Sequence, residues 1–496
     1  MLVQFRSSLI ALAAASIGAS TATAQPTQQD PTTGELRLSP CGEEIAPPAE
    51  CGTFTVWENR NARTGRTIDL NVVLLRATGE DRQPDPVVYL TGGPGQGATS
   101  LTRGMARNPL RDTRDILLVD QRGTGRSNGL FCGPEPTAPA AEFMPTLDTA
   151  RARWCANELS SRADLRYYLT PYAMDDLDDL RAAFDYDELN LVGTSYGTRA
   201  ALVYLRRHGD HVRSVTLQGS TAMSHPMPAG FAEGAEDALD GVIRDCAADS
   251  ACAATFPDLR RDFQHAVSAI EAGPREYSVR DPRDDSSATV QLTARDFAEA
   301  LRAMLYAPAS ARLIPLLLHH AATTGDYQLF AQFQLRRNIG LTQGLAQGMY
   351  LAVTCTEDVA RTDTAAAYGA GHNTFLADHR ARAHIDSCRG WPRGKLPAGY
   401  GEEVTSEVPV LIVTGEYDPA TPPSDAHAAA SRLSNARVVI VPRGGHSAAG
   451  LTGAACVRRL TTEFVETADP DGLDTACLAD MHRPPFAVSE DEMPGR

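Results

Sequence analysis

The chain of 496 residues is long enough for two or three domains, or for one large domain that carries an insertion. With 43% hydrophobic and 22% charged residues, its composition is that of a globular protein, which excludes wholesale disorder. The net charge of −16 argues against binding to nucleic acid or to an anionic membrane, because both need clustered positive charge.

Residues 1–24 have the pattern of a secretory signal peptide. Arg6 supplies a positive charge, residues 9–19 are apolar, and Ala22-Thr23-Ala24 is a small-residue cleavage signal. The alternative is an uncleaved anchor or an ordinary start. The apolar stretch is too short to span a bilayer, and no later run of about 18 apolar residues follows, so we expect no membrane span after signal removal. Residues 25–40, rich in Gln, Pro and Thr, predict a flexible leader.

Ten cysteines support export. In chain order they form five neighbouring pairs, which are Cys41 and Cys51, Cys132 and Cys155, Cys246 and Cys252, Cys355 and Cys388, and Cys456 and Cys477. In an oxidising compartment these predict five local disulfides, although reduced and buried cysteines remain the alternative. The absence of a CxxC motif and of zinc-like Cys/His spacing predicts no metal site. We therefore expect a secreted or periplasmic protein, and its oligomeric state stays open.

From residue 41 to residue 220 the pattern alternates between strands and helices. Polar and apolar residues alternate as in half-buried strands at 52–57 and 68–76. Continuous apolar runs, typical of parallel strands buried on both faces, occur at 87–90, 116–119, 189–192 and 212–217. Helical spacing is found at 175–184 and 195–207.

After residue 220 the pattern becomes mainly helical, up to residue 404. Ala-rich amphipathic segments occur at 229–246, 258–271, 294–321 and 344–381, and strand patterns resume at 408–413 and 436–441. This order predicts an α/β fold with a mostly parallel, doubly wound sheet. Its core would be formed by residues 41–220 and 405–496, with a helical cap, or lid, at 221–404.

Gly193-Thr194-Ser195-Tyr196-Gly197 lies between a predicted strand and a predicted helix. The Gly-x-Ser-x-Gly pattern is typical of a nucleophile elbow, a sharp turn that exposes the serine hydroxyl above the sheet. Glycines are needed because a Cβ would clash in so tight a turn. The five-residue pattern alone is weak, and its position between strand and helix carries the prediction that Ser195 is the nucleophile.

A serine nucleophile needs a base and an orienting carboxylate. His446 follows the last predicted strand on a glycine-rich turn, and Asp418 follows the strand before it. The order Ser, Asp, His is that of α/β-hydrolases and differs from the other common serine-protease orders. Glu416 is the rival acid. We favour Asp418 because the turn begins there and Pro419 follows it.

An oxyanion hole should come from the turn after the strand at 87–90. Successive glycines at Gly92 and Gly93 let a backbone N–H approach a tetrahedral intermediate, so Gly93 and Tyr196 are the predicted donors. A further loop at 120–127 contains a Gly-x-Gly pattern but lacks the Gly-Lys-Ser/Thr of a phosphate-binding loop. We interpret it as structural support for the active-site face.

Together these motifs resemble the α/β-hydrolases related to prolyl iminopeptidase, and in particular their secreted tripeptidyl-aminopeptidase-like branch. The resemblance covers nearly all of the chain after residue 24. It rests on Gly92-Gly93-Pro94-Gly95, Asp120-x-Arg122-Gly123-x-Gly125-x-Ser127, Gly193-Thr194-Ser195-Tyr196-Gly197, Gly415-x-x-Asp418-Pro419-x-Thr421-Pro422, Gly445-His446, Cys246 with Cys252 ahead of Phe256-Pro257, and Cys388-x-x-Trp391-Pro392. Thr91 stands where prolyl iminopeptidases usually have His, which fits the tripeptidyl-type branch better.

The resemblance implies a serine exopeptidase that acts on peptides with a free N-terminus and needs no cofactor. Such an enzyme must bind a protonated amine, and a carboxylate of the lid would do so. Glu357 is the candidate, with Asp358 as the second choice, and a solvated acidic pair is the alternative. Two other classes stay open: a secreted carboxylesterase on the same scaffold, and a binding protein with a relict triad.

Overall fold

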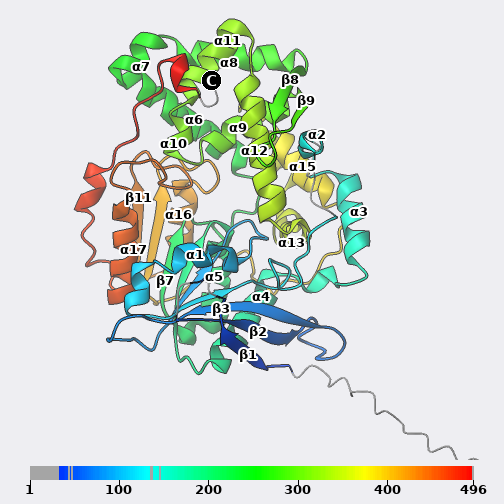
Figure 1. Ribbon diagram of the computed structural model, residues 1–496, viewed down its shortest axis with the longest axis vertical. Coiled ribbons are helices and arrows are strands. Elements are labelled where there is room, and N and C mark those ends of the chain that lie inside the picture. Colours follow the sequence, from blue (N-terminus) through cyan, green and yellow to red (C-terminus); the bar gives the residue numbers. More distant parts are fainter. Residues whose placement is uncertain (1–32, 43–44, 46–47, 134–137, 144–146, 494–496) are drawn as a thin grey trace, which may run out of the picture. The chain divides into compact units, whose positions relative to one another are not determined.

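The computed structural model describes most of the chain after residue 32 (Figure 1). The described ranges are 33–42, 45, 48–133, 138–143 and 147–493. The predicted signal peptide, and residues 25–32 of the predicted leader, lie outside them. Among the helices of the described part, none is long and apolar enough to cross a membrane.

A nine-stranded sheet carries the fold, in the order β1-β2-β3-β5-β4-β6-β7-β10-β11. Its strands are β1 (Leu36–Pro40), β2 (Ala49–Trp57), β3 (Thr67–Leu75), β4 (Val87–Leu90), β5 (Ile116–Val119), β6 (Leu189–Thr194), β7 (Val212–Gln218), β10 (Val410–Gly415) and β11 (Ala436–Val441). From β5 to β11 all neighbours are parallel, whereas β1, β2, β3 and β5 pair antiparallel. The prediction of a mostly parallel sheet is confirmed, because buried apolar runs became its central strands.

The predicted leader is wrong in its last part. Residues 36–40 form β1, which pairs with β2 from Leu36 opposite Phe54 to Pro40 opposite Glu50. Leu36 and Leu38 pack against the main core. The composition of residues 25–40 did not indicate this edge strand. Its alternating pattern contains only two leucines, which is too short to be recognised after a polar segment.

The segments that supply the sheet also form helices. They are α1 (Thr102–Met105), α2 (Pro139–Glu142), α3 (Thr149–Leu159), α4 (Thr170–Ala183), α5 (Tyr196–His208), α16 (Pro423–Ala430) and α17 (Ala455–Thr467). Helix α5 packs on β4, β6 and β7, and its first ten residues, 196–205, are all buried. The helix that begins directly after Ser195 is therefore firmly held on the sheet.

The segment after β7 is mainly helical, as predicted. Its helices are α6 (Phe231–Ala248), α7 (Ser250–Thr255), α8 (Leu259–Glu271), α9 (Ala294–Met304), α10 (Pro308–Ala311), α11 (Ile314–Thr324), α12 (Gln328–Gly344), α13 (Gln347–Val353), α14 (Thr364–Gly369) and α15 (His379–Ser387). The amphipathic segment at 294–321 is divided into three helices, and proline opens α10 and follows the first residue of α11. The hairpin of β8 (Arg275–Arg280) and β9 (Ser287–Leu292) was not predicted.

Two large apolar clusters divide the described chain differently from the predicted boundaries. One cluster is built from residues between 238 and 339 together with Phe486, Ala487 and Met493. The other joins the sheet to residues between 346 and 404. The last part of the predicted cap thus packs with the sheet, and the chain end at 486–493 packs with the cap. Figure 1 shows that end beside α8 and α11.

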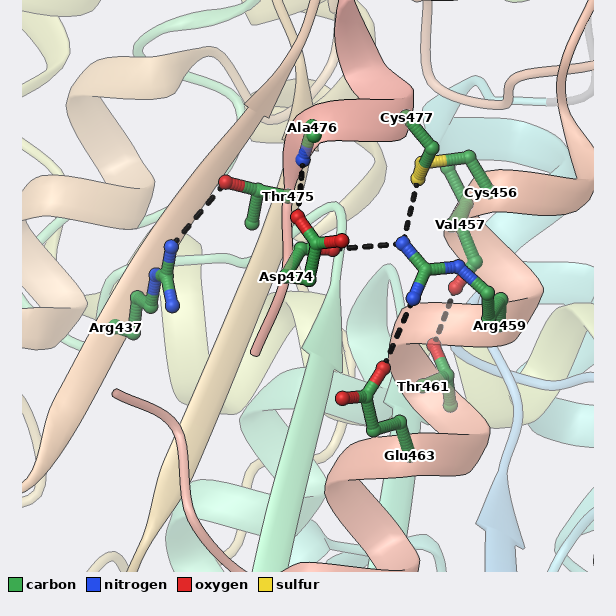
Figure 2. The surroundings of a disulfide bond; sticks show 10 residues. All are labelled: Arg437, Cys456, Val457, Arg459, Thr461, Glu463, Asp474, Thr475, Ala476 and Cys477. Carbon is green, nitrogen blue, oxygen red and sulfur yellow. Dashed lines mark hydrogen bonds and ion pairs between the residues drawn. A yellow bond between two sulfur atoms is a disulfide. The ribbon is translucent and has the colours of Figure 1, made fainter. Parts of the chain in front are cut away.

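All five predicted disulfides are formed, each between sequential cysteines. Figure 2 shows Cys456–Cys477, which ties α17 to the short 3₁₀ helix at Ala476–Asp480. Beside it, Arg459 donates to the carbonyl oxygen of Asp474 at 2.7 Å and to Sγ of Cys477 at 3.0 Å (Figure 2). This crosslink holds the segment after α17 before the chain continues to the cap.

Candidate active site

Ser195 occupies the turn between β6 and α5 in a backbone conformation that residues other than glycine rarely adopt. Its φ is 57° and its ψ is −126°. A Cβ on Gly193 would lie 2.4 Å from the carbonyl oxygen of Gly197, and one on Gly197 would lie 1.9 Å from that of Leu90. Strand, turn and helix therefore meet only because both positions are glycine. The turn has the geometry that the Gly-x-Ser-x-Gly pattern predicts.

His446 and Asp418 lie together beyond the ends of β11 and β10. The imidazole Nδ1 is 2.8 Å from Oδ2 and 3.0 Å from Oδ1 of Asp418, which is 2% exposed. Oδ1 also accepts from the backbone N–H groups of Ala420 and Thr421 at 2.8 and 2.9 Å. Burial would raise the pKa of Asp418, but the neighbouring imidazole and these N–H groups outweigh it and lower that pKa.

Thr421 completes the surroundings of this pair. Its hydroxyl donates to Oδ2 of Asp418 at 2.7 Å and lies 3.1 Å from Nδ1 of His446. The rival acid Glu416 is exposed and accepts from the backbone N–H of Arg443 at 2.8 Å. Of the two candidate acids, the structure therefore brings Asp418 to the imidazole.

Ser195 and His446 line one pocket. The hydrogen bonds of the described residues do not include one between the Ser195 hydroxyl and His446, and such contacts are often long before substrate binds. Behind the imidazole, Gly219 approaches so closely that a Cβ there would lie 3.0 Å from Cε1 of His446. The loop after β7 thus packs closely against the ring of His446.

Gly93 and Tyr196 also line this pocket. Within the described residues, neither backbone N–H donates a hydrogen bond to a protein acceptor. Gly93 has a φ of +110°, which favours glycine, and a Cβ on its neighbour Gly92 would lie 3.0 Å from Cβ of Ser195. Tyr196 is the first residue of α5, where the helix dipole is positive. Both N–H groups are available to an oxyanion beside Ser195.

The loop at 120–127 is tied into the fold. Asp120 accepts from the backbone N–H groups of Thr99 at 2.9 Å and Arg126 at 3.0 Å. Arg122 is fully buried and binds the Asp176 carboxylate through two nitrogens at 2.6 and 2.8 Å. These contacts agree with a structural loop, because the side chains of Asp120 and Arg122 are both bound within the protein.

The pocket has a volume of about 1080 Å³ and lies between the turns of the sheet and the cap. The sheet side supplies Gly93, Ser195 and His446, and the cap side supplies α9, α12 and the beginning of α15. A cavity of this size is at the upper end of the range of small-molecule sites. It has room for several residues of a peptide.

The comparison with known proteins agrees with this architecture. A sequence profile described as the α/β hydrolase fold matches residues 85–450. The chain belongs to the α/β hydrolase fold family.

Several curated relatives of this α/β hydrolase are peptidases by name. Serine protease Hip1 of Mycobacterium tuberculosis is 24% identical over 417 residues, which cover 75% of this chain and 77% of that protein. Tripeptidyl aminopeptidase of Streptomyces coelicolor is 26% identical over 481 residues, covering 87% of this chain and 83% of that protein. Proline iminopeptidase of Neisseria gonorrhoeae is 29% identical over 142 residues, covering 28% and 34%. The resemblance inferred from the motifs is thereby confirmed.

The structure does not bring Glu357 and Asp358 to the pocket of this α/β hydrolase. Both are fully buried in a turn of π-helix at Thr354–Asp358 and do not line the cavity. Glu357 accepts from the N–H and hydroxyl of Thr170, each at 2.7 Å, and from the hydroxyl of Tyr400. Burial raises the pKa of its carboxyl despite these donors. The expectation that Glu357 meets a substrate amine does not fit this position.

Asp358 is similarly committed. Its Oδ1 accepts from Nη1 of Arg199 at 2.7 Å and from the backbone N–H of Met227 at 3.1 Å. Arg199 lies on α5, one turn beyond Ser195, and is 1% exposed. Asp358 therefore holds α5, the helix that begins directly after Ser195, through Arg199. The resemblance implied a lid carboxylate that binds the substrate amine, but the direction of the side chains of Glu357 and Asp358 depends on tertiary packing.

The charged residues that do line the cap side were missed by sequence reasoning. Among the described lining residues, one carboxylate, Glu299, occurs with five arginines. The arginines are Arg151, Arg295, Arg302, Arg337 and Arg380. On α9, residues 295, 299 and 302 follow one another at helical spacing. That signal was present, but a charged stripe on an amphipathic helix usually indicates a solvent-facing side.

One group of side chains outside the pocket has the spacing of metal ligands. Asp178, His208 and His211 each offer an atom, and these atoms lie within 4.8 Å of one another. Asp178 already accepts from Arg181 at 2.8 Å and from Tyr204 at 2.9 Å. Neighbouring protein groups thus account for the arrangement, which does not extend the chemistry of the pocket.

Proposed function

We propose that this chain is a secreted or periplasmic serine hydrolase that cleaves peptides near a free N-terminus. The observation that carries the proposal is the pairing of His446 with the buried Asp418 at the wall of the pocket that also holds Ser195. Two relatives whose matches cover most of both chains are peptidases by name, which supports peptides as the substrates. Five disulfides support an oxidising compartment.

The proposed reaction needs groups of the protein and water alone. His446 takes the hydroxyl proton through Nε2 as Oγ of Ser195 attacks the scissile carbonyl carbon. Asp418 fixes the ring through Nδ1 and stabilises its protonated form. The N–H groups of Gly93 and Tyr196 bind the negative oxygen of the tetrahedral intermediate. When the C–N bond breaks, the imidazolium gives its proton to the leaving amine and the acyl group remains on the serine oxygen.

Deacylation runs through the same groups. His446 removes a proton from water, whose oxygen attacks the acyl carbon of the ester on Ser195. The intermediate again places its negative oxygen at the two N–H groups. Its collapse returns the proton to the serine oxygen and releases the acyl product as a carboxylic acid. The enzyme is regenerated without a net change in its own protonation.

A carboxylesterase on the same scaffold is the second candidate. A Ser-His-Asp arrangement does not by itself select amides over esters. The position of Glu357 strengthens this alternative, because the acid expected to recognise a peptide amine is bound within the protein instead. The substrate test must therefore include an ester.

The test is chromophore release by purified protein from Pro-, Ala- and Ala-Ala-Pro-linked reporters, each with a free and an acetylated N-terminus, beside a short-chain ester. Cleavage of the free-amine peptides alone is expected, and the longest productive peptide then gives the number of residues released. Ser195→Ala, purified in parallel, should lose this activity and keep its circular dichroism spectrum. Ester cleavage without any response to free-amine peptides would move the assignment to an esterase.

A further inference from the structure

The cap wall of the pocket carries an excess of positive charge around a single acid. Glu299 binds Nη2 of Arg337 at 2.9 Å and Nη1 of Arg380 at 2.9 and 3.0 Å. Burial would raise the pKa of Glu299, but Arg380, Arg337 and Arg302 outweigh it and lower that pKa strongly. Three guanidinium groups thus surround one ionised carboxylate, which leaves two positive charges uncompensated within this group.

Of these three arginines, Arg302 is the one that does not form a hydrogen bond with Glu299. The residue is 2% exposed and lines the pocket, and its Nε and Nη2 atoms are buried without a hydrogen-bond partner. Its guanidinium lies against two aromatic rings, 4.7 Å from the centre of Phe231 and 5.0 Å from that of Tyr306. Arg380 lies against the same ring of Phe231 at 4.8 Å, and its Nε is also buried without a partner.

A buried arginine with unused donors destabilises the folded protein, because water no longer solvates its charge. Nearly every buried charge in proteins is paired or hydrogen-bonded for this reason. Arg302, Arg337 and Arg380 line a cavity that must admit substrate, and the chain as a whole has a net charge of −16. Local positive charge in so acidic a protein points to an anionic group as the missing partner.

We infer that Arg302, with Arg337 and Arg380, binds a carboxylate of the substrate. A carboxylate is the anion that peptides carry, either on an Asp or Glu side chain or at a C-terminus, and the planar guanidinium matches its geometry. This inference rests on the proposed peptidase function and narrows its substrates to acidic or short peptides.

The distance between the Arg302 guanidinium and the imidazole of His446 is one that a short peptide can span. Tyr306 stacks edge-on against His446 with 5.0 Å between ring centres, and Arg302 lies 5.0 Å from that same tyrosine ring. Tyr306 therefore bridges the arginine and the imidazole. The guanidinium is within about 10 Å of His446, a distance that about three extended residues span. A carboxylate one to three residues from the scissile bond would reach it.

The test compares kcat/KM for free-amine tripeptide reporters that carry Glu or Gln at each of the three positions in turn. A second arm compares unlabelled tetrapeptides that end in a free carboxylate or a carboxamide, with products measured by chromatography. We expect one position, or the free C-terminus, to raise kcat/KM about tenfold to hundredfold over its neutral partner. The arm that responds identifies the source of the carboxylate.

Arg302→Met removes the charge and keeps an apolar stem against the aromatic rings. It should reduce the Glu-to-Gln ratio toward one. Arg336→Met is the matched control, because Arg336 is an exposed arginine of α12 that does not line the pocket, and the ratio should persist. If Arg302→Met does not fold, the salt dependence of the wild-type protein provides the test. The ratio of kcat/KM for the Glu peptide to that for the Gln peptide should decrease when the salt concentration is raised from about 0.05 M to about 1 M, whereas kcat/KM for the Gln peptide should change little.

The outcomes separate this inference from the proposed function. The carboxylate site is overturned if free-amine peptides are cleaved but kcat/KM differs by less than about twofold between Glu and Gln at every position and between a free carboxylate and a carboxamide at the C-terminus. The proposed peptidase function would still stand. Absence of all peptide cleavage with ester cleavage overturns the peptidase. In that case nitrophenyl monoglutarate, compared with nitrophenyl valerate, decides the carboxylate site: a preference for the glutarate supports it, and equal rates overturn it.

Discussion

The sharpest prediction concerns Asp418→Asn. In the native site, Oδ1 accepts from the backbone N–H groups of Ala420 and Thr421, at 2.8 and 2.9 Å. An asparagine must keep its oxygen there, because its NH₂ group cannot accept a hydrogen bond. The NH₂ group is therefore forced into the position of Oδ2, which lies 2.8 Å from Nδ1 of His446. It donates to Nδ1 and leaves the ring proton on Nε2, so the ring no longer accepts the proton of Ser195.

The expected loss follows from this change of tautomer. The same substitution in a well-studied Ser-His-Asp triad lowers kcat by about 10⁴. Such a factor corresponds to about 5.4 kcal/mol of transition-state free energy. We expect a similar loss of kcat here, with KM changed little, because Asp418 is buried beside the imidazole rather than in the substrate pocket. The assay is hydrolysis of the best free-amine reporter, measured with enzyme pure enough to detect a residual 10⁻⁴ of the native rate.

Glu416→Gln is the matched control, since Glu416 is the other acid of this turn. Its carboxylate is exposed and binds the backbone N–H of Arg443, so the amide oxygen of Gln can replace it and activity should stay within about twofold. The reasoning is refuted if Asp418→Asn retains more than a tenth of the native kcat. An equal loss in both variants would point to a disturbed turn instead of a wrong tautomer.

Three further predictions follow from buried groups. Glu357→Gln should lower the free energy of unfolding by about 1–3 kcal/mol, because one donor to its carboxylate loses its acceptor; urea titration measures this, and a raised KM at unchanged stability would contradict the assignment. Replacing both Cys355 and Cys388 by Ala should cost about 3–4 kcal/mol in the same titration, since their separation is 33 residues, and no change would contradict a closed loop. The lowered pKa of Asp418 beside His446 stabilises the fold above the unfolded pKa of about 3.9, and this contribution is lost as pH falls through the folded value; the melting temperature should therefore drop more steeply below about pH 4 in the native protein than in the Asn variant.

Local patterns were sufficient for much of the core. Val87–Leu90 and Ile116–Val119 are strands with the predicted bounds, because continuous apolar runs between polar turns have few other stable positions than the middle of a sheet. Ser195 could be placed because glycine spacing, the preceding strand and the following helix are all local. The cysteine pairs were also accessible, since short separations favour closure between neighbours along the chain.

Features that depend on long-range packing were not accessible in this way. Strand β1 became visible only with its partner β2, and the hairpin of β8 and β9 lies inside a segment dominated by helical patterns. The chain end at 486–493 packs on the cap although it follows the core in sequence. In each case a short segment gains its stability from a surface supplied by a distant part of the chain.

The same contrast holds within the site. The residue types, their order and their positions after strands follow from the sequence, because the carboxyl ends of parallel strands gather at one edge of the sheet. The directions of charged side chains do not, since a helix segment can present either face to a cavity. Glu357 turns toward Thr170 and Tyr400, whereas Glu299 and Arg302 face the pocket. Packing between the cap and the sheet decides which charges meet the substrate, and therefore which substrates this α/β hydrolase can bind.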